Sequence, residues 1–199
     1  MNWDALFGLL VAALALMGSP GPATLSVAAT SAVFGLGRAV PYYFGICCGT
    51  STVVLLVGTG VTGLITTLPG ISPILVSLAG AYILYLAYRI ATAPALTAEG
   101  GSSPAPRAIS GYLLAIANPK AYAAMGALFA GYALISTDPQ SNAVTKAMIL
   151  IALVFFVNLV WLIAGRGLAQ FFQSERSARI LYVGFAILLV ASLVPLLLN

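Results

Sequence analysis

The stretch "GSPGPAT" (residues 18–24) interrupts an apolar segment that begins at Ala5 and continues beyond residue 24. Prolines normally end a helix, because proline lacks an amide hydrogen and its ring clashes with the preceding turn. Apolar residues nevertheless resume immediately, so the segment is interrupted and not terminated. We interpret the stretch as the point where one helix ends and another begins within the same apolar segment.

The composition indicates an integral membrane protein. Of the 199 residues, 61% are hydrophobic and 6% are charged, and the mean hydropathy is +1.08. A water-soluble domain carries about 25% charged residues, so this chain has too few to cover a soluble surface. The formal charge of +4 is small and dispersed. It argues against a nucleic-acid partner and suits basic loops beside a lipid bilayer.

Six apolar stretches follow one another, each long enough to cross about 30 Å of hydrocarbon as a helix. They cover residues 5–33, 39–66, 71–91, 109–133, 144–166 and 178–198. A flexible linker rich in Pro, Gly, Ser and Ala (92–108) separates a first half (1–91) from a second half (109–199). We predict an all-α integral membrane protein with one transmembrane domain (1–199). Its six transmembrane helices form two inverted three-helix halves, with the first and fourth helices broken.

The basic residues predict the orientation of these helices. Connections after the first, third and fifth stretches carry Arg38, Arg89, Arg107, Arg166, Arg176 and Arg179, whereas the opposite face carries only Lys146. Cytoplasmic loops are enriched in Lys and Arg, so the linker is predicted to be cytoplasmic and both termini to lie outside. The two halves would then run in opposite directions, as in an inverted repeat. We expect a multi-pass protein of the inner (plasma) membrane.

The second half contains a similar interruption, "ANPKA" (residues 117–121). Ser19–Pro20 and Asn118–Pro119 each combine a favourable N-cap residue with a proline suited to the first helical position. Each pair therefore predicts a half-helix that starts inside the membrane with free amides and the positive end of its dipole. Prolines that only kink their helices are the alternative interpretation.

Each proline also removes the usual partner of the carbonyl four residues earlier, which leaves acceptors beside the free amides. Together these groups suit a zwitterion such as an amino acid, and paired broken helices point to a transporter site. Lys120 supports this interpretation because an ionisable residue deep in a membrane is costly, although a packing role is the alternative. For Asn158 two alternative roles are equally supported: it accepts a hydrogen bond from an ammonium group of the substrate, or it forms a hydrogen bond between two helices. The substrate-binding candidates are Ser19, Pro20, Gly21, Pro22, Thr24, Tyr82, Asn118, Pro119, Lys120, Tyr122 and Asn158.

Three stretches carry a family resemblance: "SPGPATL" (19–25), "GAYILYLAYR" (80–89) and "NPKAY" (118–122). In order and spacing they resemble signature stretches of the LysE/RhtB family of amino acid exporters, and the resemblance covers nearly the whole chain. It implies proton-driven efflux of amino acids or related small metabolites through the inner membrane. Many members carry acidic residues in the second and fifth spans, where this chain has Thr50 and Asn158. The missing carboxylates argue against proton antiport and against strongly cationic substrates.

Other functions have weaker support in the sequence. Heavy-metal efflux would rely on Cys47 and Cys48, but the chain has no histidine to complete a site. A membrane thiol-redox carrier would need cysteines on two separate helices. No nucleophile–base set indicates an enzyme, and we expect neither a cofactor nor a metal. The expected partners are a small amino acid-like substrate and the bilayer, with a homodimer possible. Gly45 and Gly49 form a GxxxG pattern that allows close helix packing, within or between protomers.

Overall fold

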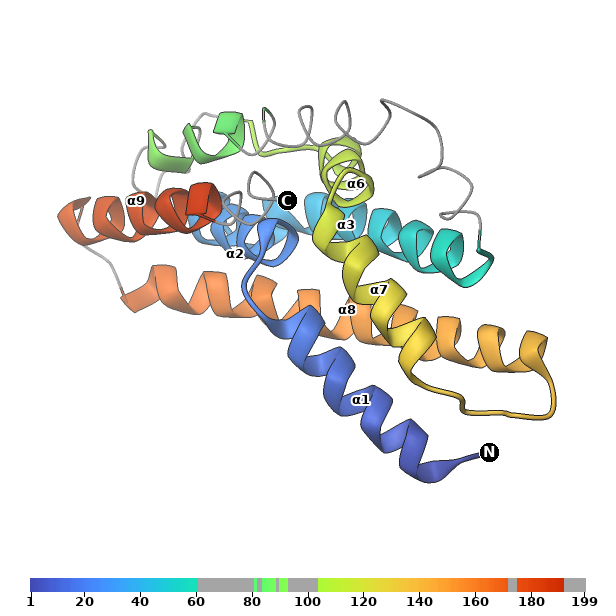
Figure 1. Cartoon of the computed structure of the whole chain (residues 1–199). Helices are drawn as coiled ribbons and strands as arrows, with labels where there is room; N and C mark the ends of the chain where they lie inside the picture. Colours follow the sequence, from blue (N-terminus) through green and yellow to red (C-terminus); the bar gives the residue numbers. More distant parts are fainter. Residues whose placement is uncertain (61–80, 82–83, 89, 93–103, 172–174, 192–199) are drawn as a thin grey trace.

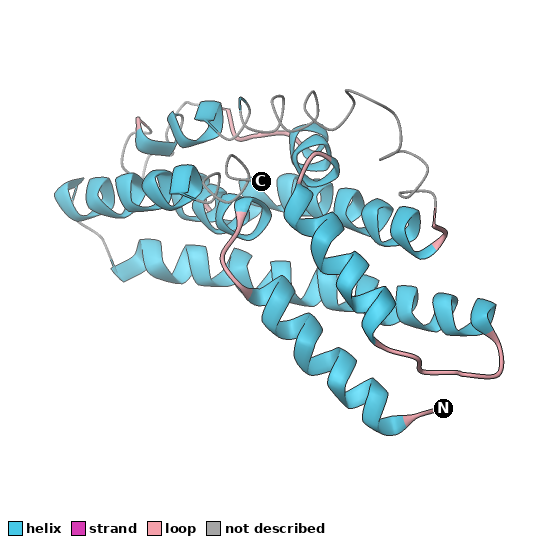
Figure 2. Ribbon diagram, in the orientation of Figure 1, coloured by secondary structure: helices cyan, strands magenta, loops and turns pink. Residues whose placement is uncertain are grey.

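The computed structural model describes residues 1–60, 81, 84–88, 90–92, 104–171 and 175–191 (Figure 1). Within these residues the secondary structure is helical, without strands (Figure 2), so the all-α prediction is confirmed. By length and composition, Leu36–Gly58 and Pro139–Leu168 can each cross a membrane. Parts of the second, third and sixth predicted stretches lie outside the described residues. The six-span inverted layout therefore stays a prediction.

The first and fourth apolar stretches are each two helices joined at a bend. Helix α1 (Trp3–Gly18) meets α2 (Pro22–Phe34) at 58°, and α6 (Ala108–Ile116) meets α7 (Pro119–Gly131) at 58°. Each pair taken together is long and apolar enough to form one broken span. The predicted interruptions in these two stretches are therefore present in the structure.

The remaining labelled helices are α3 (Leu36–Gly58), α8 (Pro139–Phe171) and α9 (Glu175–Ala191). Helix α8 has 33 residues, about 50 Å at about 1.5 Å per residue, and exceeds the predicted 144–166 stretch at both ends. Arg166 therefore lies inside α8 and not in the connection after it, which corrects the loop assignment. At the start of α8, the Asp138 carboxylate accepts from the Gln140 amide (2.9 Å) and the Ser141 hydroxyl (2.5 Å). The bond from the Ser141 hydroxyl, together with those from the Ser141 and Gln140 amides, holds the pKa of Asp138 below its ordinary value.

Helices from the two predicted halves pack against each other. Helix α1 contacts α7, α2 contacts α8, and α3 contacts α6 (Figure 1). Helix α2 also contacts α3 and α9, and all of its residues except Ala23 are buried. Such burial suits a helix without charged residues, and its four hydroxyl side chains are buried as well: Thr24, Ser26, Thr30 and Ser31. By contrast, Phe7 of α1 and Met148 of α8 are exposed, as side chains facing lipid would be.

Glycines allow α3 and α6 to approach closely. A Cβ atom at Gly45 would overlap the Ala108 carbonyl, and one at Gly49 would lie 2.6 Å from the backbone carbonyl oxygen of Tyr112. The GxxxG pattern of α3 therefore serves packing inside the chain, one of the two alternatives that the sequence allows.

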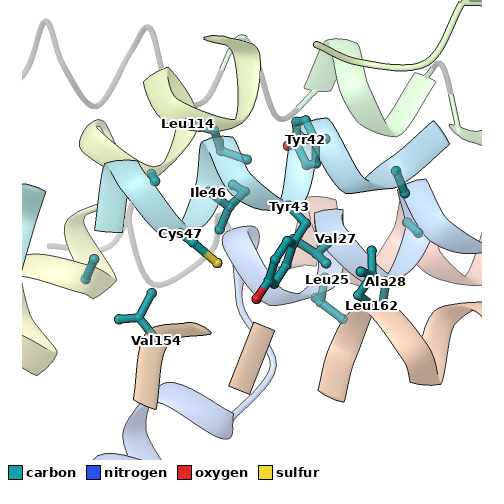
Figure 3. Packing of buried hydrophobic residues seen from close by; sticks show 14 of the residues in the cluster. Leu25, Val27, Ala28, Tyr42, Tyr43, Ile46, Cys47, Leu114, Val154 and Leu162 are labelled. Atoms are coloured by element: carbon teal, nitrogen blue, oxygen red, sulfur yellow. The ribbon is translucent and has the colours of Figure 1, made fainter. Parts of the chain in front are cut away.

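Two polar α3 side chains point toward α8 in the apolar interior. Figure 3 shows Tyr43 and Cys47 projecting in that direction among buried aliphatic side chains. The Tyr43 hydroxyl donates to the Phe155 carbonyl of α8 (3.0 Å). Cys47 is buried, whereas Cys48 is exposed on another face of the same helix.

Lys146 does not lie in a loop, contrary to the sequence interpretation. It belongs to α8 and is only 3% exposed. Its ammonium group donates to the Phe129 carbonyl (2.6 Å) and the Tyr132 carbonyl (2.8 Å) at the C-terminal end of α7. A cation at this end satisfies carbonyls that lack helical partners and matches the helix dipole, which explains its burial.

Candidate functional site

The first break begins two residues later than the sequence interpretation placed it. Ser19 is the C-cap of α1, and Gly21 is the N-cap of α2 with Pro22 at the first helical position. The predicted Ser19–Pro20 start is therefore wrong. A residue that precedes proline is pushed out of the α region, and Gly21 precedes Pro22. Gly21 is accordingly extended (φ −166°, ψ 176°), so no helix can run from Pro20 through it.

The second break follows the predicted pattern. Asn118 is the N-cap of α7, and Pro119 occupies the first helical position. The Asn118 carboxamide oxygen accepts from the Lys120 amide (3.2 Å), and its backbone carbonyl accepts from the Ala121 amide (3.0 Å). The first amides of α7, which the sequence interpretation left free, are thus satisfied within the protein.

The N-terminus of α2 differs because its cap has no side chain. The Gly21 amide donates to the Thr24 hydroxyl oxygen (3.0 Å), and the Leu25 amide donates to the Gly21 carbonyl (2.9 Å). The amides of Ala23 and Thr24 have no hydrogen-bond partner among the described residues. This helix end therefore keeps the free donors and the positive dipole end that favour an anion.

Lys120 joins the two breaks, which are about 100 residues apart in the chain. Its ammonium group donates to the Ser19 carbonyl (2.8 Å), the Ser19 hydroxyl (2.8 Å) and the Pro20 carbonyl (3.2 Å). An ammonium group has three hydrogens, so these bonds use all of them. The structure therefore brings the two predicted interruptions side by side, as a shared site requires.

Carbonyls at the breaks find partners inside the protein, which corrects the expectation of free acceptors. The Leu16 carbonyl accepts from the Ser19 hydroxyl (2.8 Å). The Ala115 carbonyl accepts from the Asn118 amide (3.2 Å). The last carbonyl of α1, at Gly18, accepts from the indole of Trp161 on α8 (3.2 Å). A cationic group of a ligand would therefore need a different acceptor.

A cavity of about 50 Å³ lies between the two breaks, α3 and α8. It is lined by Leu16, Met17, Gly21, Ala23, Thr24, Thr50, Asn118, Lys120, Ala121, Ala124, Met125, Val154 and Asn158. One buried water needs about 10–15 Å³ of such volume, so the cavity has room for a few waters. Among the lining residues that the structure describes, one carries an ammonium group, several carry neutral polar groups and none carries a carboxylate.

Asn158 supplies an acceptor that no protein group uses. Its side chain is 5% exposed, and its nitrogen donates to the Val154 carbonyl (2.8 Å) one turn earlier in α8. A flipped carboxamide would place its oxygen against the Val154 carbonyl oxygen, and neither atom can donate. This bond therefore assigns the nitrogen and the oxygen of the Asn158 carboxamide. Its oxygen is buried and has no partner within the described chain. Such a buried, unpaired acceptor is costly unless a ligand or water pairs with it.

The predicted site residues fall into three groups. Gly21, Thr24, Asn118, Lys120 and Asn158 line the cavity. Ser19 and Pro20 contact Lys120 through their oxygens, and Pro22 and Pro119 start the two half-helices. Tyr122 is partly buried on α7 but does not line the cavity. Tyr82 lies outside the described residues.

Several lining residues were not among the predicted site residues. Thr50 of α3 is one of them, although the resemblance marked its position as one where related proteins carry an acid. The marked positions, Thr50 and Asn158, both line the cavity. Met17, Ala121, Ala124, Met125 and Val154 are apolar members of apolar helices, so their sequence positions gave no signal.

The family model for the LysE type translocator matches residues 14–198, which include both breaks, Thr50 and Asn158. The chain belongs to the LysE type translocator family. It is therefore a membrane protein of a transporter family, and both breaks and the lining residues of the cavity lie within the matched residues. Comparisons with curated proteins and with solved structures gave no match.

Proposed function

We propose that this translocator exports small amino acids or related zwitterionic metabolites across the inner membrane by alternating access. One observation carries the proposal: the cavity is lined by Ala23 and Thr24 of α2, whose amides have no partner among the described residues, and by Asn158 of α8, whose buried carboxamide oxygen has none either. A zwitterion has the complementary groups, since its carboxylate needs donors and its ammonium group needs an acceptor.

The carboxylate would bind at the N-terminus of α2. The amides of Ala23 and Thr24 are free there, and the Lys120 ammonium lies beside Gly21 in the same cavity. Hydrogen bonds between ionised groups and amides are about twice as strong as neutral ones. The helix dipole adds to this preference for negative charge.

The ammonium group of the substrate would donate to the Asn158 carboxamide oxygen, with the Thr50 hydroxyl also on the cavity wall. Both groups are neutral, so the charge of Lys120 is balanced by the substrate carboxylate alone. A second positive charge on the substrate would meet repulsion without a partner, which disfavours lysine-like substrates. The small volume favours glycine, alanine or serine over larger amino acids.

We further propose six spans with both termini outside and a cytoplasmic linker at 92–108. Two halves, 1–91 and 109–199, would form the inverted repeat. The described residues that line the cavity include no carboxylate that could carry a coupling proton, so export driven by the substrate gradient fits this site better than proton antiport.

The cysteines support the alternative functions poorly. Cys47 and Cys48 lie on the same helix, and one is buried while the other is exposed. The described residues contain no group of three or more His, Cys, Asp or Glu side chains that could hold a metal ion. A variant with both cysteines replaced by alanine should therefore export normally.

The test is efflux from proteoliposomes loaded with an amino acid panel, with and without a pH gradient. We expect export of glycine, alanine or serine, little export of lysine or arginine, and no requirement for the gradient. Asn158→Leu should lose this export, whereas the double cysteine variant should keep it. Export that requires the two cysteines, or a panel in which no amino acid moves, would contradict the proposal.

A further inference from the structure

Three consecutive carbonyls of the first break are held by side chains from other helices. The Gly18 carbonyl accepts from Trp161 of α8, and the Ser19 and Pro20 carbonyls accept from Lys120 of α7. We call the three bonds from the Lys120 ammonium to Ser19 and Pro20 the Lys120 tie. It fastens the junction between α1 and α2 to the start of α7.

The Lys120 tie uses every hydrogen of a cation that also lines the cavity. A carboxylate that binds at the α2 N-terminus must therefore take at least one hydrogen from Ser19 or Pro20 to bond with Lys120. A carboxylate is the stronger competitor, because a bond between two ionised groups exceeds one to a neutral carbonyl. The bond to Pro20 is the longest of the three, at 3.2 Å, and is the first expected to yield.

Gly21 makes the room that the Lys120 tie occupies. A Cβ atom at Gly21 would lie 2.9 Å from the Lys120 ammonium nitrogen and 3.0 Å from its Cδ. The backbone of Gly21 is extended and tolerates any residue, so the only conflict there is with the lysine side chain. A methyl group at this position would displace the ammonium group without removing its charge.

We propose that the Lys120 tie is a latch released by the substrate carboxylate, which loosens the first break so that the cavity can open. This proposal rests on the proposed function and adds how the site distinguishes its substrates. An amino acid amide has the same ammonium group but no anionic group to compete for Lys120. Amides should therefore reach Asn158 and leave the latch closed.

Trp161 provides a reporter for the release. The chain has two tryptophans, Trp3 and Trp161, so Trp3→Phe leaves one indole, which contacts the first break through Gly18. Trp161 does not line the cavity, so a bound substrate would act on it through the break or through Asn158, one turn earlier in α8. The amide, which also reaches Asn158, separates these two routes. The probes are glycine, L-alanine and L-serine with their amides, added to purified Trp3→Phe protein. The acid exported fastest from liposomes is used with its own amide.

The expected result is a shift of Trp161 emission with the acid and none with the amide. In Gly21→Ala the emission should be shifted before substrate is added, with acid affinity no weaker than in the parent protein. Gly126→Ala on α7 is the matched control, because a Cβ there meets nothing within 4 Å, and it should behave like the parent. Lys120→Met should also show shifted emission, but its acid affinity should fall about 10- to 150-fold because the charged contact is lost.

The outcomes separate the latch from the proposed function. Export of none of the three acids would refute the proposed function and the latch with it. Export without an acid-dependent Trp161 shift would refute the latch alone. Equal shifts with acid and amide, or parent-like emission in Gly21→Ala, would also refute it, since either result means that the carboxylate does not act through the Lys120 tie.

Discussion

Replacing Asn158 with leucine should weaken substrate binding without weakening the folded protein. No protein group among the described residues pairs with the buried Asn158 oxygen, and a buried acceptor left unpaired costs about 1–3 kcal/mol. Leucine has a similar volume and removes that cost. It also removes the bond from the carboxamide nitrogen to the Val154 carbonyl, worth about 0.5–1.5 kcal/mol.

These opposing terms leave the stability of Asn158→Leu unchanged or higher by about 1–2 kcal/mol, which corresponds to about 2–8 °C in melting temperature. Substrate binding loses a hydrogen bond to an ammonium group, about 1.5–3 kcal/mol, so the dissociation constant should rise about 10- to 150-fold. The assays are calorimetric titration of the exported amino acid and a thermal melt, both in detergent.

Asn142 offers a matched control on the same helix. Its carboxamide oxygen accepts from the Leu134 amide (2.8 Å) and the Ile135 amide (3.2 Å), so it is fully used by the protein. Asn142→Leu should lower the melting temperature and leave the dissociation constant unchanged, the reverse of Asn158→Leu. The reasoning fails if Asn158→Leu melts well below the parent protein while binding the substrate equally well.

Three further predictions concern the scaffold and the topology. Lys146→Met should lower the melting temperature and leave substrate affinity unchanged, because it removes two charged bonds at the end of α7, outside the cavity; a melt and a titration check this. Gly49→Ala should reduce the yield of monodisperse protein in size-exclusion chromatography, since its methyl group would lie 2.6 Å from the Tyr112 carbonyl oxygen, whereas Gly37→Ala has open space. A single cysteine in the 92–108 linker, in a variant without the native cysteines, should not react with an impermeant maleimide in intact cells. Reaction there would place the linker outside and contradict the predicted orientation.

The positions of the two breaks could be predicted because proline acts locally. Pro119 after Asn118 started a helix where the sequence indicated, and the cap bond was the expected one. The first break was displaced by two residues because two prolines compete there. The restriction that Pro22 places on Gly21 decided between them, and a search for good N-cap residues alone does not include that restriction.

The partners of the buried cations could not be predicted, because they depend on tertiary contacts. Lys120 and Lys146 both bond to carbonyls at helix ends on other elements, far along the chain in the case of Lys120. Sequence alone could show that a lysine inside an apolar stretch needs acceptors. It could not show which helix ends would come within reach, because α1 packs on α7 and α8 only in the folded chain.

The difference between the two breaks depends on what stands at the N-cap. Asn118 satisfies the first amide of α7, so that helix end has little left to offer a ligand. At α2 a residue with a Cβ atom at Gly21 would push the Lys120 side chain out of its present position. The glycine that admits the lysine is therefore also the reason that Ala23 and Thr24 keep free amides. A cation and an uncapped helix end thus lie together in one cavity, and both favour the same negatively charged group.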